Sequence, residues 1–96
     1  MIKHVFMCKL KHREGEDLER AVTALRGLRD HIGALLSLEV GVDLKRSPIS
    51  YDIAAVACFA DWDALARYSA DPKYKEVVGL LRELCESFAV VDYESS

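Results

Sequence analysis

The sequence has no run of about 18 apolar residues that could span a membrane, and no apolar core followed by a cleavage site near its N-terminus. We therefore expect a soluble, cytoplasmic protein with no membrane partner. Basic residues are also few, because 13 Lys and Arg stand against 16 Asp and Glu, a formal net charge of −3. Without a basic stripe, no nucleic-acid partner is expected.

Cysteine is scarce as well. Cys8, Cys58 and Cys85 are odd in number, widely spaced and set in apolar segments, which favours reduced buried thiols over a disulfide framework. The chain contains no linker, internal repeat or low-complexity segment, so its 96 residues are expected to form one domain, residues 1–96. A chain of this length buries only roughly 60 to 65% of its unfolded surface when it folds alone, so a second subunit would add useful burial.

Hydrophobic periodicity predicts strands and helices in alternation. Residues 1–10 and 35–44 alternate with period two, residues 51–59 are apolar on both faces, and residues 88–93 close the chain as a strand. Residues 16–32 carry apolar side chains at helical spacing. Two further helices are expected after Asp61 and Asp71, which are N-cap residues, and the second helix is expected to continue to residue 85.

This order of elements matches a split βαβ arrangement twice over. We predict an α+β, ferredoxin-like fold with a four-stranded antiparallel sheet, the first strand between the third and the fourth. Right-handed crossovers place all helices on one face of such a sheet. The other face would be bare and apolar, and a second copy packed sheet to sheet is its simplest cover, which predicts a homodimer. The side chains expected on that face are Val5, Met7, Ala54, Val56, Cys58, Ala89, Val91 and Tyr93.

One histidine interrupts an apolar strand face. Alternation places His4 between Ile2 and Phe6, and the same rule places Asp92 beside Val90 at the end of the chain. If the first and last strands are antiparallel neighbours, His4 comes opposite Asp92. The pair is then either a structural contact that satisfies two polar groups or the centre of a small reactive site.

Short motifs in a fixed order extend this picture along nearly the whole chain. They are Lys3-His4, Lys9-Leu10-Lys11, Ser37-Leu38-Glu39-Val40-Gly41, Tyr51-Asp52, Phe59-Ala60-Asp61, Tyr68, Pro72 and Val91-Asp92-Tyr93. In order and spacing the chain resembles the stress-responsive A/B barrel (Dabb) family, which implies a dimeric α/β barrel. The family includes plant polyketide cyclases and heat-stable stress proteins, so the resemblance leaves the activity open.

The cyclase branch of that family carries a pocket between helices and sheet. Its first-strand histidine and second-helix tyrosine match His4 and Tyr68, whereas the family's His-Pro-x-His reads Asp71-Pro72-Lys73-Tyr74 here. If the chain is an enzyme, we expect His4 to take a proton, Asp92 to orient the imidazole, and Tyr68 to donate to an oxyanion, with Tyr74 as a further donor. The other walls of the pocket are expected to be Phe6, Cys8, Leu25, Val42, Ala55, Ala57, Trp62, Leu65, Leu81, Phe88 and Val90, which suit a flat apolar ligand.

Each of these residues also has a structural interpretation. Trp62 and Tyr68 are also the kind of residues that pack a short helix against a sheet. Cys8 has no basic neighbour that would make it a nucleophile. One histidine and one aspartate fall short of a metal site, so neither metal nor cofactor is expected. The sequence therefore predicts a small-molecule-binding protein, a cofactor-free cyclase or isomerase acting on an apolar or aromatic carbonyl compound. The alternative is a non-enzymatic, stress-associated structural homo-oligomer.

Overall fold

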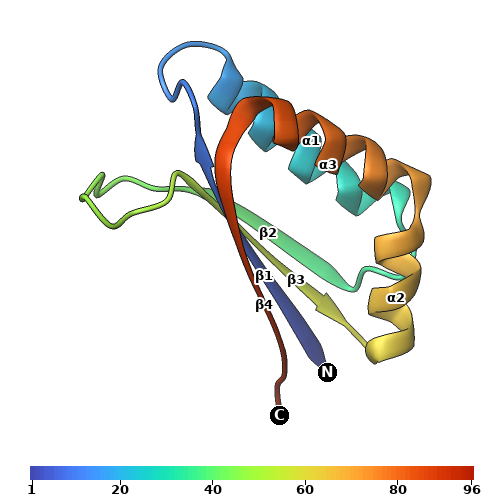
Figure 1. The fold of residues 1–96 in the computed structure, drawn as a ribbon. Coiled ribbons are helices and arrows are strands. Elements are labelled where there is room, and N and C mark those ends of the chain that lie inside the picture. The colour runs from blue at the N-terminus through green and yellow to red at the C-terminus, as the bar shows by residue number, and fades with distance from the viewer.

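The computed structural model describes residues 1–96 and has the predicted order of elements (Figure 1). These are β1 (Ile2–Leu10), α1 (Asp17–His31), β2 (Ser37–Val42), β3 (Ile53–Phe59), α2 (Trp62–Ala70), α3 (Pro72–Leu84) and β4 (Cys85–Glu94). The strands form one antiparallel sheet in the order β2-β3-β1-β4, which confirms the ferredoxin-like fold and places β1 between β3 and β4.

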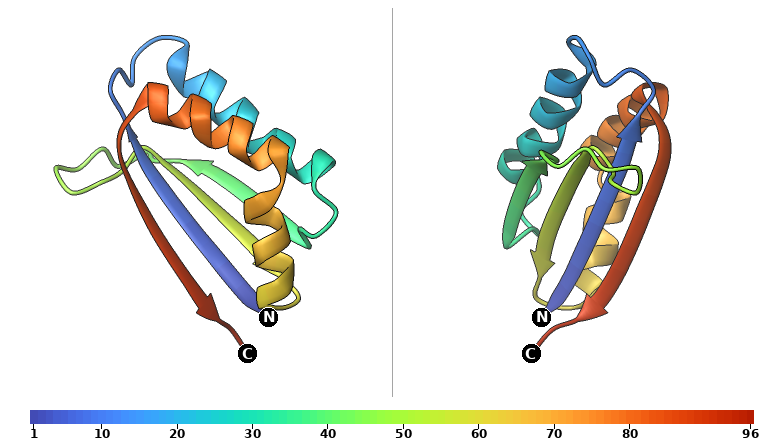
Figure 2. Two further views of the ribbon diagram at one scale, coloured as in Figure 1. Left: turned by 45° about the vertical axis from the view of Figure 1, so that its right-hand side comes forward. Right: turned by 90° about the vertical axis from the view of Figure 1, so that its left-hand side faces the viewer.

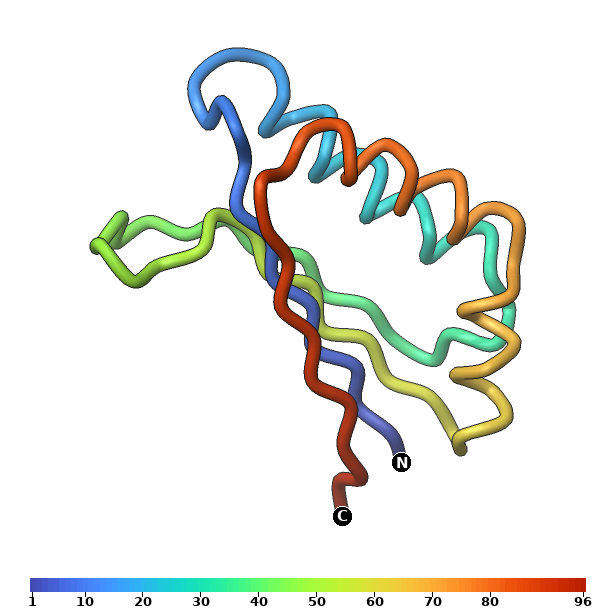
Figure 3. Tube along the Cα trace, in the orientation of Figure 1, coloured from blue at the N-terminus to red at the C-terminus, as the bar shows by residue number.

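The helices cover one face of the sheet and leave the other bare. Helices α1 and α3 lie side by side above the strands, and α2 closes the end of the molecule at which β3 ends (Figures 1 and 2). The trace in Figure 3 shows α3 turning directly into β4 and diverging from it. The two chain ends lie side by side, since the backbone N–H of Ser95 donates to the carbonyl of Met1 at 2.8 Å.

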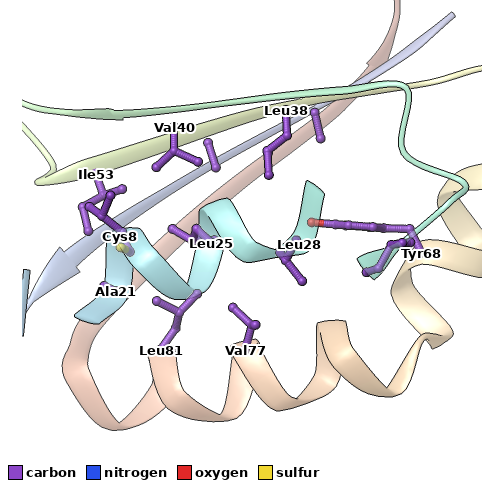
Figure 4. Packing of buried hydrophobic residues seen from close by; sticks show 14 of the residues in the cluster. Cys8, Ala21, Leu25, Leu28, Leu38, Val40, Ile53, Tyr68, Val77 and Leu81 are labelled. Carbon is purple, nitrogen blue, oxygen red and sulfur yellow. The ribbon is translucent and has the colours of Figure 1, made fainter. Parts of the chain in front are cut away.

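The core lies between the helices and the inner face of the sheet. Leu25 and Leu28 of α1 meet Val77 and Leu81 of α3, and the strands contribute every second residue (Figure 4). Burial of such side chains removes apolar area from water at about 25 cal/mol per Å², the main term that favours folding. The buried strand residues are Ile2, Cys8, Leu10, Leu38, Val40, Ile53, Ala55, Ala57, Phe59 and Cys85.

Both predicted N-caps are present. A carboxylate oxygen of Asp61 accepts from the N–H of Ala64 at 2.8 Å, and Asp71 accepts from the N–H of Lys73 at the same distance. Each satisfies a backbone donor that the first turn of a helix leaves free. These caps fix the start of α2 and α3 and therefore the positions of Tyr68 and Tyr74.

The predicted bounds of several elements need correction. The second strand spans Ser37–Val42 rather than 35–44, because its pairing with β3 runs only from Ser37 opposite Cys58 to Val42 opposite Ile53. Leu36 and Leu44 lie beyond its two ends and are exposed. The third strand correspondingly begins at Ile53 and not at residue 51. The last helix ends at Leu84, because Cys85 already pairs with Leu10 as the first residue of β4.

Candidate functional site

His4 and Asp92 stand at the centre of the candidate site. They are direct partners in the register of β1 and β4, and the Nδ1–H of His4 donates to Oδ1 of Asp92. His4 is 9% exposed and is the only polar residue among the buried ones, whereas a third of the Asp92 side chain remains accessible. The carboxylate thus fixes the imidazole by one nitrogen and leaves Nε2 as the nitrogen available for chemistry.

Aromatic rings pack around this imidazole. Tyr68 of α2 meets it edge-on with ring centroids 6.1 Å apart. The Tyr68 ring also packs, tilted, against Phe59 and Tyr74, with centroid distances of 4.9 Å and 4.6 Å. Burial raises the pKa of both phenols, and the nearby Asp92 charge adds to the shift for the pKa of Tyr74. Both hydroxyls therefore stay protonated near neutral pH and can donate hydrogen bonds.

A pocket lies beside the imidazole, between the sheet and the helices. Its lining consists of His4, Phe6, Leu25, Leu38, Ala55, Ala57, Tyr68, Tyr74, Val78 and Leu81. The free volume of the pocket is about 20 Å³, which is enough for about one water molecule. A ligand larger than a water molecule must therefore displace side chains at the walls.

Several residues predicted to line the pocket lie in it. Phe6, Leu25, Ala55, Ala57, Tyr74 and Leu81 do so together with His4 and Tyr68. Two lining residues were missed, Leu38 and Val78. Both had a signal in the sequence, since Leu38 lies on the inner face of β2 opposite Ala57, and Val78 lies one helical turn after Tyr74.

The predicted walls Cys8, Val42, Phe88 and Val90 lie outside the pocket. Cys8 and Val42 share its face of the sheet but lie further along the strands, near the ends at which Cys8 and Val42 both neighbour Ile53. Phe88 and Val90 are 39% and 50% exposed. They belong to the edge strand β4, which diverges from α3 after Cys85 (Figure 3) and so carries no helix above it.

Of the three α2 residues predicted at the site, Tyr68 lines the pocket, whereas the predictions for Trp62 and Leu65 were wrong. Trp62 is 52% exposed, and Leu65 is half-buried against the core without reaching the pocket. The buried face of α2 is set by Ala64 and Tyr68, which are four residues apart. At about 100° per residue, Trp62 points about 140° away from the middle of that face, toward solvent.

Stability at alkaline pH follows from these buried groups. Burial raises the pKa of Tyr68 and of the Cys8 thiol above their ordinary values of 10.0 and 9.0, so the native state keeps protons that the unfolded chain releases. The two groups therefore do not lower the free energy of unfolding below about pH 9. As the pH rises further, the free energy of unfolding falls. We expect urea titrations between about pH 8 and pH 11 to show this decline, and to show a shallower one for Tyr68→Phe. If the free energy of unfolding falls equally steeply with pH in the two proteins, burial does not raise the pKa of Tyr68.

No cluster of three or more His, Cys, Asp or Glu side chains that could hold a metal ion occurs in the structure. Burial raises the pKa of Cys8, and the neighbouring Cys85 raises it further by a smaller amount. The Cys8 thiol therefore stays in its unreactive protonated form. None of the three helices combines the length and hydropathy that a membrane-spanning helix needs. The chemistry available at the site is thus one imidazole with its carboxylate, two phenols and apolar walls.

Comparisons with known proteins identify the family of the chain and structures of similar fold. The family model for the stress responsive A/B barrel domain matches residues 2–95. A dimeric ferredoxin-like protein of unknown function from Thermobifida fusca has a TM-score of 0.86 at 22% identity, covering 98% of this chain and 90% of the other. A dimeric protein of ferredoxin-like fold from Bacteroides fragilis gives 0.83 at 27% identity, with 98% and 95% covered. The hydroxynitrile lyase of Passiflora edulis gives 0.87 at 14% identity, with 99% and 93% covered. No curated protein matches the sequence.

Proposed function

The chain belongs to the stress-responsive A/B barrel (Dabb) family, and on that premise we propose that it binds a small apolar or aromatic carbonyl compound and converts it as a cofactor-free cyclase or isomerase. The observation that carries the proposal is the buried imidazole of His4, which is fixed by Asp92 and faces a pocket whose other walls are apolar or phenolic. A neutral, mostly apolar ligand suits these walls, since the lining contains no lysine or arginine to pair with an anionic group.

In the proposed reaction, Nε2 of His4 removes a proton from the carbon next to the ligand carbonyl. The electron pair of the broken C–H bond moves to the carbonyl oxygen, and the hydroxyl of Tyr68 or Tyr74 donates a hydrogen bond to that oxyanion. In an isomerase the ligand carries a C=C bond conjugated with the enolate, and His4 returns the proton to the far carbon of that conjugated system. In a cyclase the enolate carbon attacks a second carbonyl of the same molecule, and His4 returns its proton to the new alkoxide.

We also propose that the working unit is a homodimer built through the bare face of the sheet. This face carries half-buried apolar side chains, among them Val5, Val56 and Ala54, which a single chain leaves open to water. The relatives from Thermobifida fusca and Bacteroides fragilis are described as dimeric. A sheet with helices on one side only gains most from a partner that covers its other side.

The alternative is a structural homo-oligomer without enzymatic activity. The observation in its favour is the small free space of the pocket, about 20 Å³, which a well-packed core with a satisfied His4–Asp92 pair would also leave. The two functions differ in ligand binding. A structural protein has no reason to bind a carbonyl compound at His4, whereas an enzyme must.

Filling the pocket tests the proposed ligand site. Val78 lines it from α3, so Val78→Phe is expected to block it and to weaken binding of an aromatic aldehyde or ketone at least tenfold. The measurement is a panel of such compounds titrated by NMR, with the imidazole signals of His4 as the reporter. Leu80→Phe is the matched control, since Leu80 is a partly buried residue of the same helix outside the pocket. Equal binding by the two variants, or no binding by the natural protein, would refute the proposed site.

A further inference from the structure

The loop between β2 and β3, residues 43–52, carries two aliphatic side chains that the rest of the chain does not cover. Leu44 is 91% exposed and Ile49 is 90% exposed, the highest values among the large apolar residues. The loop projects beyond the sheet on the side away from the helices (Figure 1), and it crosses in front of β1 when the bare face is viewed (Figure 2, right). The loop that carries these two residues therefore lies on the bare side of the molecule.

Hydrogen bonds hold this loop in one shape at its base. Arg13 donates to Oδ1 of Asp52 at 2.9 Å and to the carbonyl of Asp43 at 2.7 Å, and the N–H of Asp43 donates to the carbonyl of Asp52 at 2.8 Å. The Arg13–Asp52 pair is mostly buried, with 16% and 14% of the two side chains accessible. This ion pair thus joins the loop to the segment that follows β1.

The tip of the loop is braced as well. Oδ2 of Asp43 accepts from the N–H of Arg46 at 2.7 Å, and the hydroxyls of Ser47 and Ser50 are 2.6 Å apart. Arg46 has a φ of 54°, a left-handed conformation that a residue with a Cβ adopts only where its surroundings impose it. A loop ordered in this way presents Leu44 and Ile49 to a partner with little further loss of backbone freedom on binding.

An open groove of about 510 Å³ separates the loop from the sheet. Ile49 and Tyr51 line it on the loop side, and Met7 and Ala54 line it on the sheet. Met7 and Ala54 also belong to the bare face through which we propose the dimer to form. The groove is therefore continuous with that interface.

We propose that the 43–52 loop is an arm that packs Leu44 and Ile49 onto a second copy of this chain, an inference that rests on the proposed dimer. In a twofold symmetric dimer the contact is made twice, because each subunit offers the same arm and the same bare face. The face itself carries Lys3, Lys9 and Glu39, which the strand register places among its apolar residues. The arm adds apolar contact where the face alone is interrupted by charge.

The β2 edge of the sheet is poorly suited to pair with a strand of a second copy. Arg29 and Arg26 of α1 donate to the carbonyls of Leu38 and Val40 in the edge strand β2. Backbone groups that are already bonded to side chains resist pairing with a strand from another molecule. Strand pairing of a second copy with the β2 edge is thus disfavoured.

The test is the double variant Leu44→Ser, Ile49→Ser in the full chain. We expect its dimer dissociation constant, measured by sedimentation equilibrium, to rise at least tenfold while circular dichroism shows an unchanged fold. Leu36→Ser is the matched control, because Leu36 is an exposed leucine at the opposite end of β2 and should leave the constant unchanged. Hydrogen exchange of the natural protein gives a second measurement, in which the amides of residues 44–50 become protected as concentration drives dimerisation.

Failure of the arm and failure of the dimer are distinguishable. A double variant that dimerises like the natural protein, with unprotected loop amides, overturns the arm even if Val56→Asp abolishes the dimer. A natural protein that sediments as a monomer overturns the proposed dimer and the arm together. Tenfold weaker dimerisation of the double variant alone, with Leu36→Ser unaffected, supports both.

Discussion

Val56→Asp is expected to turn the proposed dimer into a monomer or an aggregate. Val56 lies in the interior strand β3, on the bare face, between Val5 of β1 and Glu39 of β2. Sheet-to-sheet packing would bury the new carboxylate beside the carboxylate of Glu39. An unpaired buried charge costs about 3 kcal/mol or more, which is roughly a hundredfold or more in the dissociation constant.

Light scattering and sedimentation measure this outcome directly. Ala60→Asp is the control, since Ala60 is exposed just beyond the end of β3 and should accept a carboxylate without effect on assembly. If Val56→Asp remains a dimer of unchanged stability, the two sheets do not face one another. A dimer would then have to form through another surface.

The second large effect concerns the pair at the site. His4→Phe keeps the volume of the ring but leaves Asp92 without its partner, and Asp92→Asn weakens the hydrogen bond to Nδ1. Each single change is expected to destabilise the protein, and the double variant to lose less than the sum of the two. The expected coupling is about 1 kcal/mol rather than the larger value of a fully buried pair, since a third of Asp92 is accessible to water.

Urea unfolding of the four proteins gives the coupling energy. The exposed pair Asp17–Arg20, with its side chains 3.3 Å apart, serves as the control, and the cycle through Asp17→Asn and Arg20→Met should show a few tenths of a kcal/mol at most. Strictly additive losses at His4 and Asp92 would show that their contact does not contribute to stability.

The sequence was sufficient for the strand register around the site. Alternation places His4 and Asp92 on the inner face, and the split βαβ order makes β1 and β4 neighbours, so the pairing of these two residues needs no further information. The N-caps at Asp61 and Asp71 were equally readable, because a short acceptor side chain before a helix has a local role.

What the sequence could not supply depends on contacts between distant segments. Trp62 is a large apolar side chain of the kind found in cores. The buried face of α2 is nevertheless set by Ala64 and Tyr68, so that Trp62 points to solvent. Phe88 and Val90 follow the inward alternation, but the divergence of α3 from β4 leaves them uncovered. The ordered shape of the 43–52 loop rests on Arg13, which lies 30 residues before Asp43 in the chain.

Ligand binding by the double variant His4→Phe, Asp92→Asn tests the proposed site most directly. The aromatic carbonyl compound that binds the natural protein most tightly in the NMR panel is titrated into both proteins by calorimetry, after circular dichroism has established that the double variant is folded. We predict at least tenfold weaker binding by the double variant, because Nε2 of His4 is the only basic nitrogen in the pocket. Unchanged affinity in a well-folded double variant would contradict the assignment of these two residues to the working site.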